Sequence, residues 1–255
     1  MKTLDKLDPT TLQPIVQALP YPPLFVTISG AHLYGFPSPD SDVDLRGAYV
    51  LPLCAVLGLD APEETITRQF ERDGREMDLV THDVARFLAL LLKKSGNVLE
   101  QIYSPLVVQG GEDFEELRVL ARGAITRHVY HHYAGFACNK IQEFEAESPH
   151  RVKTLLYVFR VLLTGIWLLQ RGEVEANLLH LNRTFRLPFI PDLIAQKSKE
   201  RAVLETDLPV YREAIARLQM QLETAFAEST LPDAPVNRAA LNDFLVRVRL
   251  EYDCG

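Results

Sequence analysis

The spacing of hydrophobic positions changes once along the chain, near residue 84. Before that point apolar residues cluster or alternate with polar ones, which predicts strands. We expect strands at residues 24–28, 43–50, 65–70 and 76–81, the last two forming a hairpin around Asp73-Gly74. After residue 84 the apolar residues recur at helical spacing. We therefore expect helices at residues 84–94, 112–121, 127–147, 152–170, 210–227 and 238–251.

Proline and glycine mark the ends of these elements. The prolines at 20, 22 and 23 stop any helix before the first strand, and Gly96 is expected to close the helix that starts at residue 84. Residues 187–191 contain two prolines and are interpreted as an extended linker. Short helices or turns are expected at residues 30–34 and 53–57. The pattern predicts an α+β fold, with a head at residues 1–117 and a helical domain at residues 118–255.

Composition narrows the class of protein. The chain has 255 residues, of which 47% are hydrophobic, so it can bury a full core. Its formal net charge of −7 argues against a protein that coats nucleic acid through bulk positive charge. The charged start of the chain lacks a following apolar signal region, and no uninterrupted apolar run approaches a membrane span, so we expect a cytoplasmic protein with no membrane partner. Cys54, Cys138 and Cys254 are far apart and are interpreted as buried or incidental thiols.

The segment from residue 28 to residue 47 carries the most specific chemical signal. Gly30 follows an apolar strand and is expected to start a turn or short helix, whose backbone N–H groups could receive phosphate oxygens. Asp42 and Asp44 occupy alternate positions of the next strand, so their side chains project from the same face. Magnesium is commonly held by one or two carboxylates together with substrate phosphates. Together, the glycine turn and the carboxylate pair predict a site for a nucleotide on a metal ion.

This segment resembles the nucleotidyltransferase superfamily of DNA polymerase β. The resemblance lies in Gly30 and in the Asp42-Val43-Asp44-Leu45 run, and the longer string around Tyr34-Gly35 and Arg46-Gly47 is similar to the RNA-repair-pathway polymerase-β-like branch. It extends over roughly residues 24 to 172. The resemblance implies a small mixed nucleotidyltransferase sheet flanked by helices, followed by the mainly helical domain.

The resemblance also implies a reaction and a set of site residues. It implies transfer of a nucleoside monophosphate from an NTP to a hydroxyl, with Mg²⁺ or Mn²⁺ as cofactor and pyrophosphate as product. Asp42, Asp44 and Asp78 are the expected catalytic and metal-binding carboxylates, with Glu76 as the alternative third member. Contacts to the nucleotide are expected from Ser29, Gly30, Ala31, Ser41, Arg46, Lys153, Tyr157 and Arg160. Arg46 shares the face of Asp42 and Asp44, and pairing with them is slightly favoured over contact with substrate.

One position departs from the family pattern. Ala31 stands where the family usually has Ser or Gly, so a hydroxyl that helps to hold the triphosphate is missing. Losing one neutral hydrogen bond would weaken nucleotide binding by about 0.5–1.5 kcal/mol, and Ser29 and Ser41 are possible substitutes. A catalytically weak or inactive nucleotide-binding regulatory protein is therefore the alternative function. The acceptor stays open among an RNA 3′ end, a protein side chain and a small molecule, as does the base of the NTP.

Other polar clusters have simpler explanations. His128 and His132 lie one helical turn apart, but no acidic residue completes a zinc motif, and a polar helix face is favoured. Asn97 and Glu100 are expected to share one face of a short helix, where bracing of the active-site strands is favoured over contact with base or ribose.

Overall fold

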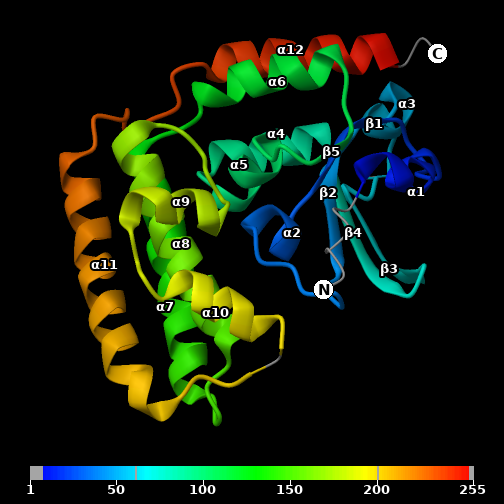
Figure 1. The fold of residues 1–255 in the computed structure, drawn as a ribbon. Helices are drawn as coiled ribbons and strands as arrows, with labels where there is room; N and C mark the ends of the chain where they lie inside the picture. The colour runs from blue at the N-terminus through cyan, green and yellow to red at the C-terminus, as the bar shows by residue number, and fades with distance from the viewer. Residues whose placement is uncertain (1–7, 61, 200, 253–255) are drawn as a thin grey trace. The chain divides into compact units, whose positions relative to one another are not determined.

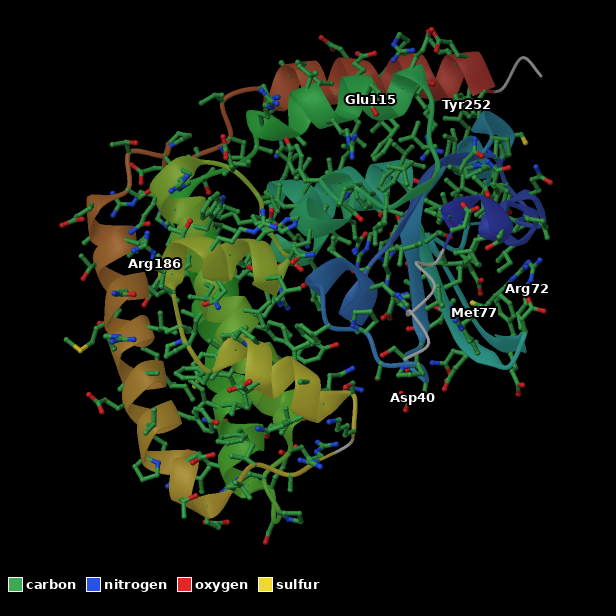
Figure 2. The ribbon with its side chains drawn as sticks, in the orientation of Figure 1. Asp40, Arg72, Met77, Glu115, Arg186 and Tyr252 are labelled. Carbon is green, nitrogen blue, oxygen red and sulfur yellow. The ribbon has the colours of Figure 1, made fainter. Side chains whose placement is uncertain are left out.

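A five-stranded mixed sheet forms the centre of the first part of the chain (Figure 1). The strand order is β3-β4-β2-β1-β5, in which β2 and β4 run parallel and the other neighbours run antiparallel. The bounds are β1 (Pro23–Ile28), β2 (Val43–Tyr49), β3 (Thr65–Arg72), β4 (Arg75–Asp83) and β5 (Val107–Gln109). In Figure 2, Arg72 and Met77 mark the two arms of the β3–β4 hairpin. The strands predicted at residues 24–28, 43–50, 65–70 and 76–81 are confirmed.

The computed structural model describes residues 8–60, 62–199 and 201–252, and these divide into two compact units. Unit 1 takes in the described residues up to Leu33, then Asp40–Ala124 and the residues from Ala234 onward. Unit 2 comprises Tyr34–Pro39 and Ile125–Asp233. The α+β prediction with a mainly helical later region is confirmed.

Helices cover both faces of the sheet in unit 1. On one face, Phe25 of β1 packs against Phe87 at a ring-centroid distance of 5.2 Å and against Phe114 at 4.4 Å. The other face is covered near the start of the chain by Leu12 and Val16. Each of these apolar side chains contributes about 1.5–3 kcal/mol when fully buried. The helical segments of unit 1 are η1 (Pro9–Leu12), α1 (Gln13–Gln17), α2 (Gly30–Tyr34, whose last residue belongs to unit 2), α3 (Leu53–Leu57), α4 (Val84–Leu92), α5 (Gly96–Ile102), α6 (Glu112–Arg122) and α12 (Arg238–Tyr252).

Unit 2 is a bundle built around one apolar helix, α8 (Val152–Arg171). Around α8 lie η2 (Arg127–Val129), α7 (Tyr130–Ala146), α9 (Leu178–Phe185), α10 (Ile190–Lys197), η3 (Glu205–Asp207) and α11 (Leu208–Glu228). Among the described residues α8 is the one helix long and apolar enough to cross a membrane, but 83% of its most apolar window is buried inside the structure. That burial is what the core helix of a bundle requires.

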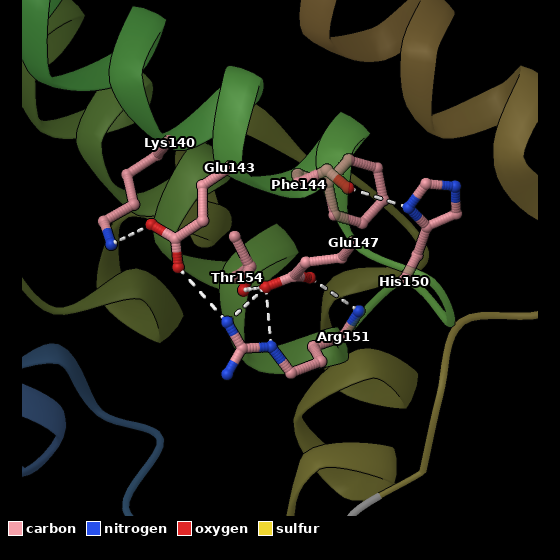
Figure 3. Close-up of polar contacts among 7 residues, drawn as sticks. All are labelled: Lys140, Glu143, Phe144, Glu147, His150, Arg151 and Thr154. Atoms are coloured by element: carbon pink, nitrogen blue, oxygen red, sulfur yellow. Dashed lines mark hydrogen bonds and ion pairs between the residues drawn. The ribbon is translucent and has the colours of Figure 1, made fainter.

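The bend between α7 and α8 is held by a network around Glu147 (Figure 3). The Glu147 carboxylate accepts hydrogen bonds from the Arg151 backbone N–H at 2.9 Å and from the Thr154 hydroxyl at 2.6 Å, and it forms an ion pair with the Arg151 guanidinium. Burial raises the pKa of Glu147, but the hydrogen bonds from Arg151 and Thr154 outweigh it and hold that pKa below its usual value. His150 Nδ1 lies 2.7 Å from the Phe144 carbonyl oxygen. The start of α8 is thus anchored to the end of α7.

The units do not part at the boundary expected between residues 117 and 118. The helix α12, expected in the helical domain, belongs to unit 1 because Arg249 forms an ion pair of 2.6 Å with Asp83 at the end of β4. The same guanidinium donates to the Leu51 carbonyl at 2.7 Å. Hydrophobic spacing identified this helix correctly, but only its long-range partners determine the unit to which it belongs.

Three local predictions are also corrected. Gly96 starts α5, whereas Lys94 adopts the left-handed conformation just after α4, with φ of 67°. Residues 187–191 are no extended linker, since α10 begins at Ile190 and places Pro191 in its first turn, where proline is well tolerated. Cys54 and Cys138 are free and exposed, not buried, and Cys254 lies outside the described residues. Four segments, η1, α1, α9 and β5, were not predicted from the sequence, and each is only three to eight residues long.

Candidate functional site

The turn after β1 is built around close contact between Gly30 and Asp44. Gly30 has φ of +61°, and a Cβ at this position would stand 1.8 Å from Oδ2 of Asp44. The Ser29 N–H donates to the Asp44 carbonyl at 2.8 Å, and the Ser104 hydroxyl donates to the Ile28 carbonyl at 2.8 Å. Position 30 therefore requires glycine both for its backbone conformation and for space. The turn brings the first residue of α2 directly against a carboxylate of β2.

Parallel pairing of β2 with β4 aligns two of the predicted carboxylates. Asp44 and Asp78 are register partners, so their side chains project from the same face of the sheet. Nη2 of Arg46 lies 2.8 Å from Oδ1 of Asp44 and 2.7 Å from Oδ2 of Asp78. Nη1 of Arg46 donates to the carbonyl oxygens of Leu45, at 2.9 Å, and Asp78, at 2.6 Å. One guanidinium thus joins both carboxylates and both strands.

The remaining candidate carboxylates lie before Asp44 and Asp78, at or ahead of the starts of β2 and β4. Asp42 immediately precedes β2 and is exposed, and Asp40 lies in the loop before it (Figure 2). Glu76 shares strand parity with Asp78 but is exposed near the start of β4. The structure therefore brings Asp44 together with Asp78, and it leaves Asp42 and Glu76 at the solvent-exposed margin of the same two strands.

The donor set can be compared with what a divalent cation needs. Within residues 8–60, 62–199 and 201–252, no group of three or more His, Cys, Asp or Glu side chains has the arrangement of a metal site. Two carboxylates do converge, and the cation between them is the Arg46 guanidinium. Because magnesium usually takes one or two carboxylates plus substrate phosphate oxygens, Asp44 and Asp78 fit such an ion when a triphosphate completes its shell.

Four of the predicted nucleotide contacts of unit 1 lie between β1 and β2. Ser29 is half-buried, and Gly30 and Ala31 are buried at the start of α2. Ser41 is half-buried one residue before Asp42. These residues come from the segment that joins β1 to β2, in which Gly30 and the Ser29 N–H lie against Asp44, and their contacts with a nucleotide stay predictions.

The stripe Lys153, Tyr157 and Arg160 lies on α8 in unit 2. Lys153 is exposed, Tyr157 is half-buried and Arg160 is fully buried. The Arg160 guanidinium stacks on Tyr34 at 3.9 Å from the ring centroid, and the Tyr34 and Tyr157 rings meet edge to face at 5.7 Å. Arg160 therefore has a structural role inside unit 2, where it fixes Tyr34. Its contact with nucleotide stays a prediction, as do those of Lys153 and Tyr157.

Two partly buried contacts tie the segment 34–39 to the bundle of unit 2. Gly35 has φ of +83°, and a Cβ there would stand 2.5 Å from Oδ1 of Asn177, the residue that caps α9. Nζ of Lys197 donates to the Ser38 hydroxyl at 2.9 Å and lies 5.8 Å from the Phe36 ring centroid. The conformation expected of Tyr34-Gly35 as a turn is thus held by residues far along the chain.

Asp83 is the N-cap of α4. Its side chain accepts from the Ala85 N–H at 3.0 Å, from the Leu51 N–H at 3.2 Å and from Arg249. Asn97 and Glu100 lie three residues apart in α5, as expected, but Asn97 is exposed while Glu100 is only 2% exposed.

Sequence reasoning missed two neighbours of the α8 stripe. Nζ of Lys140 lies 5.8 Å from the centroid of the Tyr157 ring, and Phe136 lies one helical turn before Lys140 on α7. The Arg160 guanidinium lies 5.7 Å from the centroid of Phe136. The i,i+4 spacing of an aromatic residue and a lysine was the available signal, but it is common on exposed helix faces.

Comparisons with known proteins found relatives of this chain. The chain is 30% identical over 241 residues to the uncharacterized protein MJ0002 of Methanocaldococcus jannaschii, covering 91% of this chain and 96% of that protein. It is 26% identical over 159 residues to the uncharacterized protein YcgL of Bacillus subtilis, covering 59% of this chain and 58% of that protein. Among solved structures, a nucleotidyltransferase-like protein from Exiguobacterium sibiricum aligns at 12% identity with a TM-score of 0.34, covering 96% of this chain and 80% of that chain.

A family model covers nearly the whole chain. The model of RlaP, described as the RNA repair pathway DNA polymerase beta family, matches residues 5–247. The match includes the Gly30 turn, the aligned pair Asp44 and Asp78, and the α8 stripe. Membership in this family suggests nucleotidyl transfer. The chain therefore belongs to the RNA repair pathway DNA polymerase beta family.

Proposed function

We propose that the protein is a metal-dependent nucleotidyltransferase that moves a nucleoside monophosphate from an NTP to a hydroxyl. The observation that carries the proposal is the meeting of Asp44 and Asp78 across the parallel pair β2–β4, next to a glycine whose missing Cβ leaves room for one of those carboxylates. Membership in the family supports the reaction class. The acceptor is an RNA 3′ end, a protein side chain or a small molecule.

The proposed reaction is an in-line displacement. The acceptor oxygen forms a bond to the α-phosphorus while the bond between that phosphorus and the bridging oxygen breaks, and pyrophosphate leaves with the electron pair. Asp78 accepts the hydroxyl proton. Mg²⁺ or Mn²⁺, held by Asp44 and Asp78 with Asp42 at the margin, would neutralise charge and make the acceptor hydroxyl more acidic.

The residues around the pair have separate proposed roles. The first backbone N–H groups of α2, at Gly30 and Ala31, receive triphosphate oxygens, and Ser29 and Ser41 supply hydroxyls in place of the one missing at position 31. Arg46 orients the two carboxylates.

Labelled triphosphates test this proposal. The protein is incubated with each α-labelled NTP, with Mg²⁺ or Mn²⁺, and with total RNA or a cell lysate as the source of acceptors. We expect label in one class of acceptor, with release of pyrophosphate, and loss of both when EDTA is added or when Asp44 is replaced by Asn.

The control is Glu76→Gln, which removes an exposed carboxylate from the strand that carries Asp78. Saturable NTP binding without label under any condition would contradict the enzymatic proposal and favour a regulatory nucleotide-binding protein. That alternative rests on the alanine at position 31.

A further inference from the structure

We infer that Arg46 is the built-in counter-cation of the carboxylate pair and competes with the divalent ion for Asp44 and Asp78. The inference rests on the proposed function, because it concerns the same pair of carboxylates. It assigns Arg46 a positioning role in the metal-free protein and a second, opposing role when a metal ion arrives.

Geometry is the first step. A single nitrogen, Nη2, accounts for both ion pairs, at 2.8 Å to Asp44 and 2.7 Å to Asp78. A magnesium ion that shares the same two oxygens would have to stand about 2.1 Å from each of them. The ion and Nη2 would then occupy the same space between the carboxylates. Binding of the ion through Oδ1 of Asp44 and Oδ2 of Asp78 therefore requires the guanidinium to withdraw.

Electrostatics is the second step. Two carboxylates brought together by strand register repel each other unless a cation lies between them. The side chains of Arg46, Asp44 and Asp78 are 19%, 26% and 24% exposed, so solvent screens their charges only partly. In the metal-free protein Arg46 supplies the neutralising charge. Its other hydrogen bonds, to the carbonyl oxygens of Leu45 and Asp78, keep the guanidinium fixed across the two strands.

The consequence is a link between metal entry and triphosphate. An ion arriving alone must replace Arg46 and leaves the displaced guanidinium without an anion. An ion arriving with a triphosphate brings phosphate oxygens, which a guanidinium binds well through its planar set of donors. Arg46 thus weakens binding of the free ion. When a triphosphate is present, the displaced Arg46 guanidinium can bind its phosphate oxygens instead. The nucleotide contact expected of Arg46 from the sequence becomes the second half of this exchange.

The test uses Mn²⁺ alone as the probe, with calorimetry of the full chain and thermal unfolding without metal. Arg46→Gln should tighten the Mn²⁺ Kd about five- to tenfold, since it removes a charge-assisted competitor. The same variant should lower the metal-free Tm, and Mn²⁺ should restore more of the Tm than in the parent. The matched control is Arg68→Gln on β3, the strand next to β4. Arg68 is exposed and donates at 3.4 Å to the Ala18 carbonyl. This variant should change neither the Mn²⁺ Kd nor the metal-free Tm.

The outcomes separate this inference from the proposed function. If Asp44→Asn abolishes Mn²⁺ binding and Arg46→Gln leaves the Kd unchanged or weakens it, the competition is refuted while the metal site stands. If Asp44→Asn binds Mn²⁺ as the parent does, the ion lies elsewhere and the proposed function fails at its first step. Absence of Mn²⁺ binding in both the parent and Arg46→Gln also refutes the competition.

A conservative variant covers the case in which Arg46→Gln does not fold. Arg46→Lys keeps the positive charge but has no planar fork to reach both carboxylates and both carbonyl oxygens at once. We expect it to fold and to bind Mn²⁺ more tightly than the parent does, by a smaller factor than the glutamine variant would. A weaker Mn²⁺ affinity in Arg46→Lys would overturn the inference.

Discussion

A Cβ placed on Gly30 would stand 1.8 Å from Oδ2 of Asp44, which makes the absence of a side chain at position 30 a condition for the carboxylate to lie where it does. Gly30 of the turn after β1 and the Asp44 carboxylate of the next strand are thus structurally coupled. Each determines the position of the other, and the geometry of the pair Asp44 and Asp78 depends on both.

The first prediction compares two glycines that share a left-handed backbone. Gly30→Ala and Gly74→Ala both place alanine at positive φ, 61° and 71°, which costs about 1–2 kcal/mol in each case. A Cβ on Gly74 meets nothing within 4 Å, whereas a Cβ on Gly30 forces Asp44 to move. We expect Gly30→Ala to lose more stability in urea unfolding and to lose Mn²⁺ binding. Equal losses of stability in the two variants would show that Asp44 moves aside at no cost in the free energy of unfolding.

The second prediction separates the two candidates for the third carboxylate. Asp78→Asn should abolish nucleotidyl transfer, because Asp78 faces Asp44 across β2 and β4, whereas Glu76→Gln should retain it. The stability cost of Asp78→Asn should be below about 1 kcal/mol, since the ion pair with Arg46 is partly exposed. Steady-state rates and urea unfolding check the two parts. Retained transfer in Asp78→Asn with loss in Glu76→Gln would reverse the assignment.

The third prediction concerns the missing hydroxyl. Ala31→Ser should tighten triphosphate binding about two- to tenfold, the effect of one neutral hydrogen bond. Ser29→Ala is the opposing change in the same turn and should weaken binding. Calorimetry with a non-hydrolysable NTP measures the affinities of the parent and of both variants. An unchanged affinity in Ala31→Ser would mean that backbone donors alone hold the phosphates at this position.

The fourth prediction is a pH dependence at His82, on the strand that carries Asp78. Burial, together with the charges of Arg86 and Arg46, lowers the pKa of His82 below its usual 6.5. The unfolded chain therefore binds a proton at a higher pH than the folded chain does. The free energy of unfolding should be at its full value above pH 6.5 and should fall as the pH drops from 6.5 toward the native pKa.

His82→Gln should remove that part of the pH dependence. Urea unfolding at pH values on both sides of 6.5 measures the slope, and the NMR titration of the His82 ring gives the native pKa. A native pKa above 6.5 would reverse the sign and contradict the prediction.

The fifth prediction tests the place of α12 in unit 1. Arg249→Met should destabilise the protein by about 3–5 kcal/mol, because it leaves Asp83 buried without its cation. Arg247→Met, two residues earlier, is the matched control. Its ion pairs with Asp113, Glu116 and Glu251 lie near the surface, and its loss should cost below about 1 kcal/mol. A cost of Arg249→Met as small as the one expected for Arg247→Met would indicate that the ion pair with Asp83 contributes little to the stability of unit 1.

The local elements and the motif could be predicted because their causes lie within short stretches of sequence. Alternation in residues 43–50 placed Asp44 and Arg46 on one face of a strand, and the hairpin around Asp73-Gly74 formed as expected. Predictions failed where a segment is too short to show a hydrophobic period, or where a proline is compatible with two different local structures. Pro191 suits an extended segment and the first turn of a helix equally well, and only the packing of α10 against α8 selects the helix.

The sequence by itself determined the strand order along the chain, the glycine turn, the parity of the carboxylates and membership in the family. The tertiary structure alone decided that Asp78 faces Asp44, that Arg46 joins them and that α12 returns to Asp83. These contacts link residues 32 and 166 positions apart in the Arg46–Asp78 and Arg249–Asp83 pairs. Hydrophobic periodicity reports which face of an element is buried, but it carries no information about which distant strand or helix will be its neighbour.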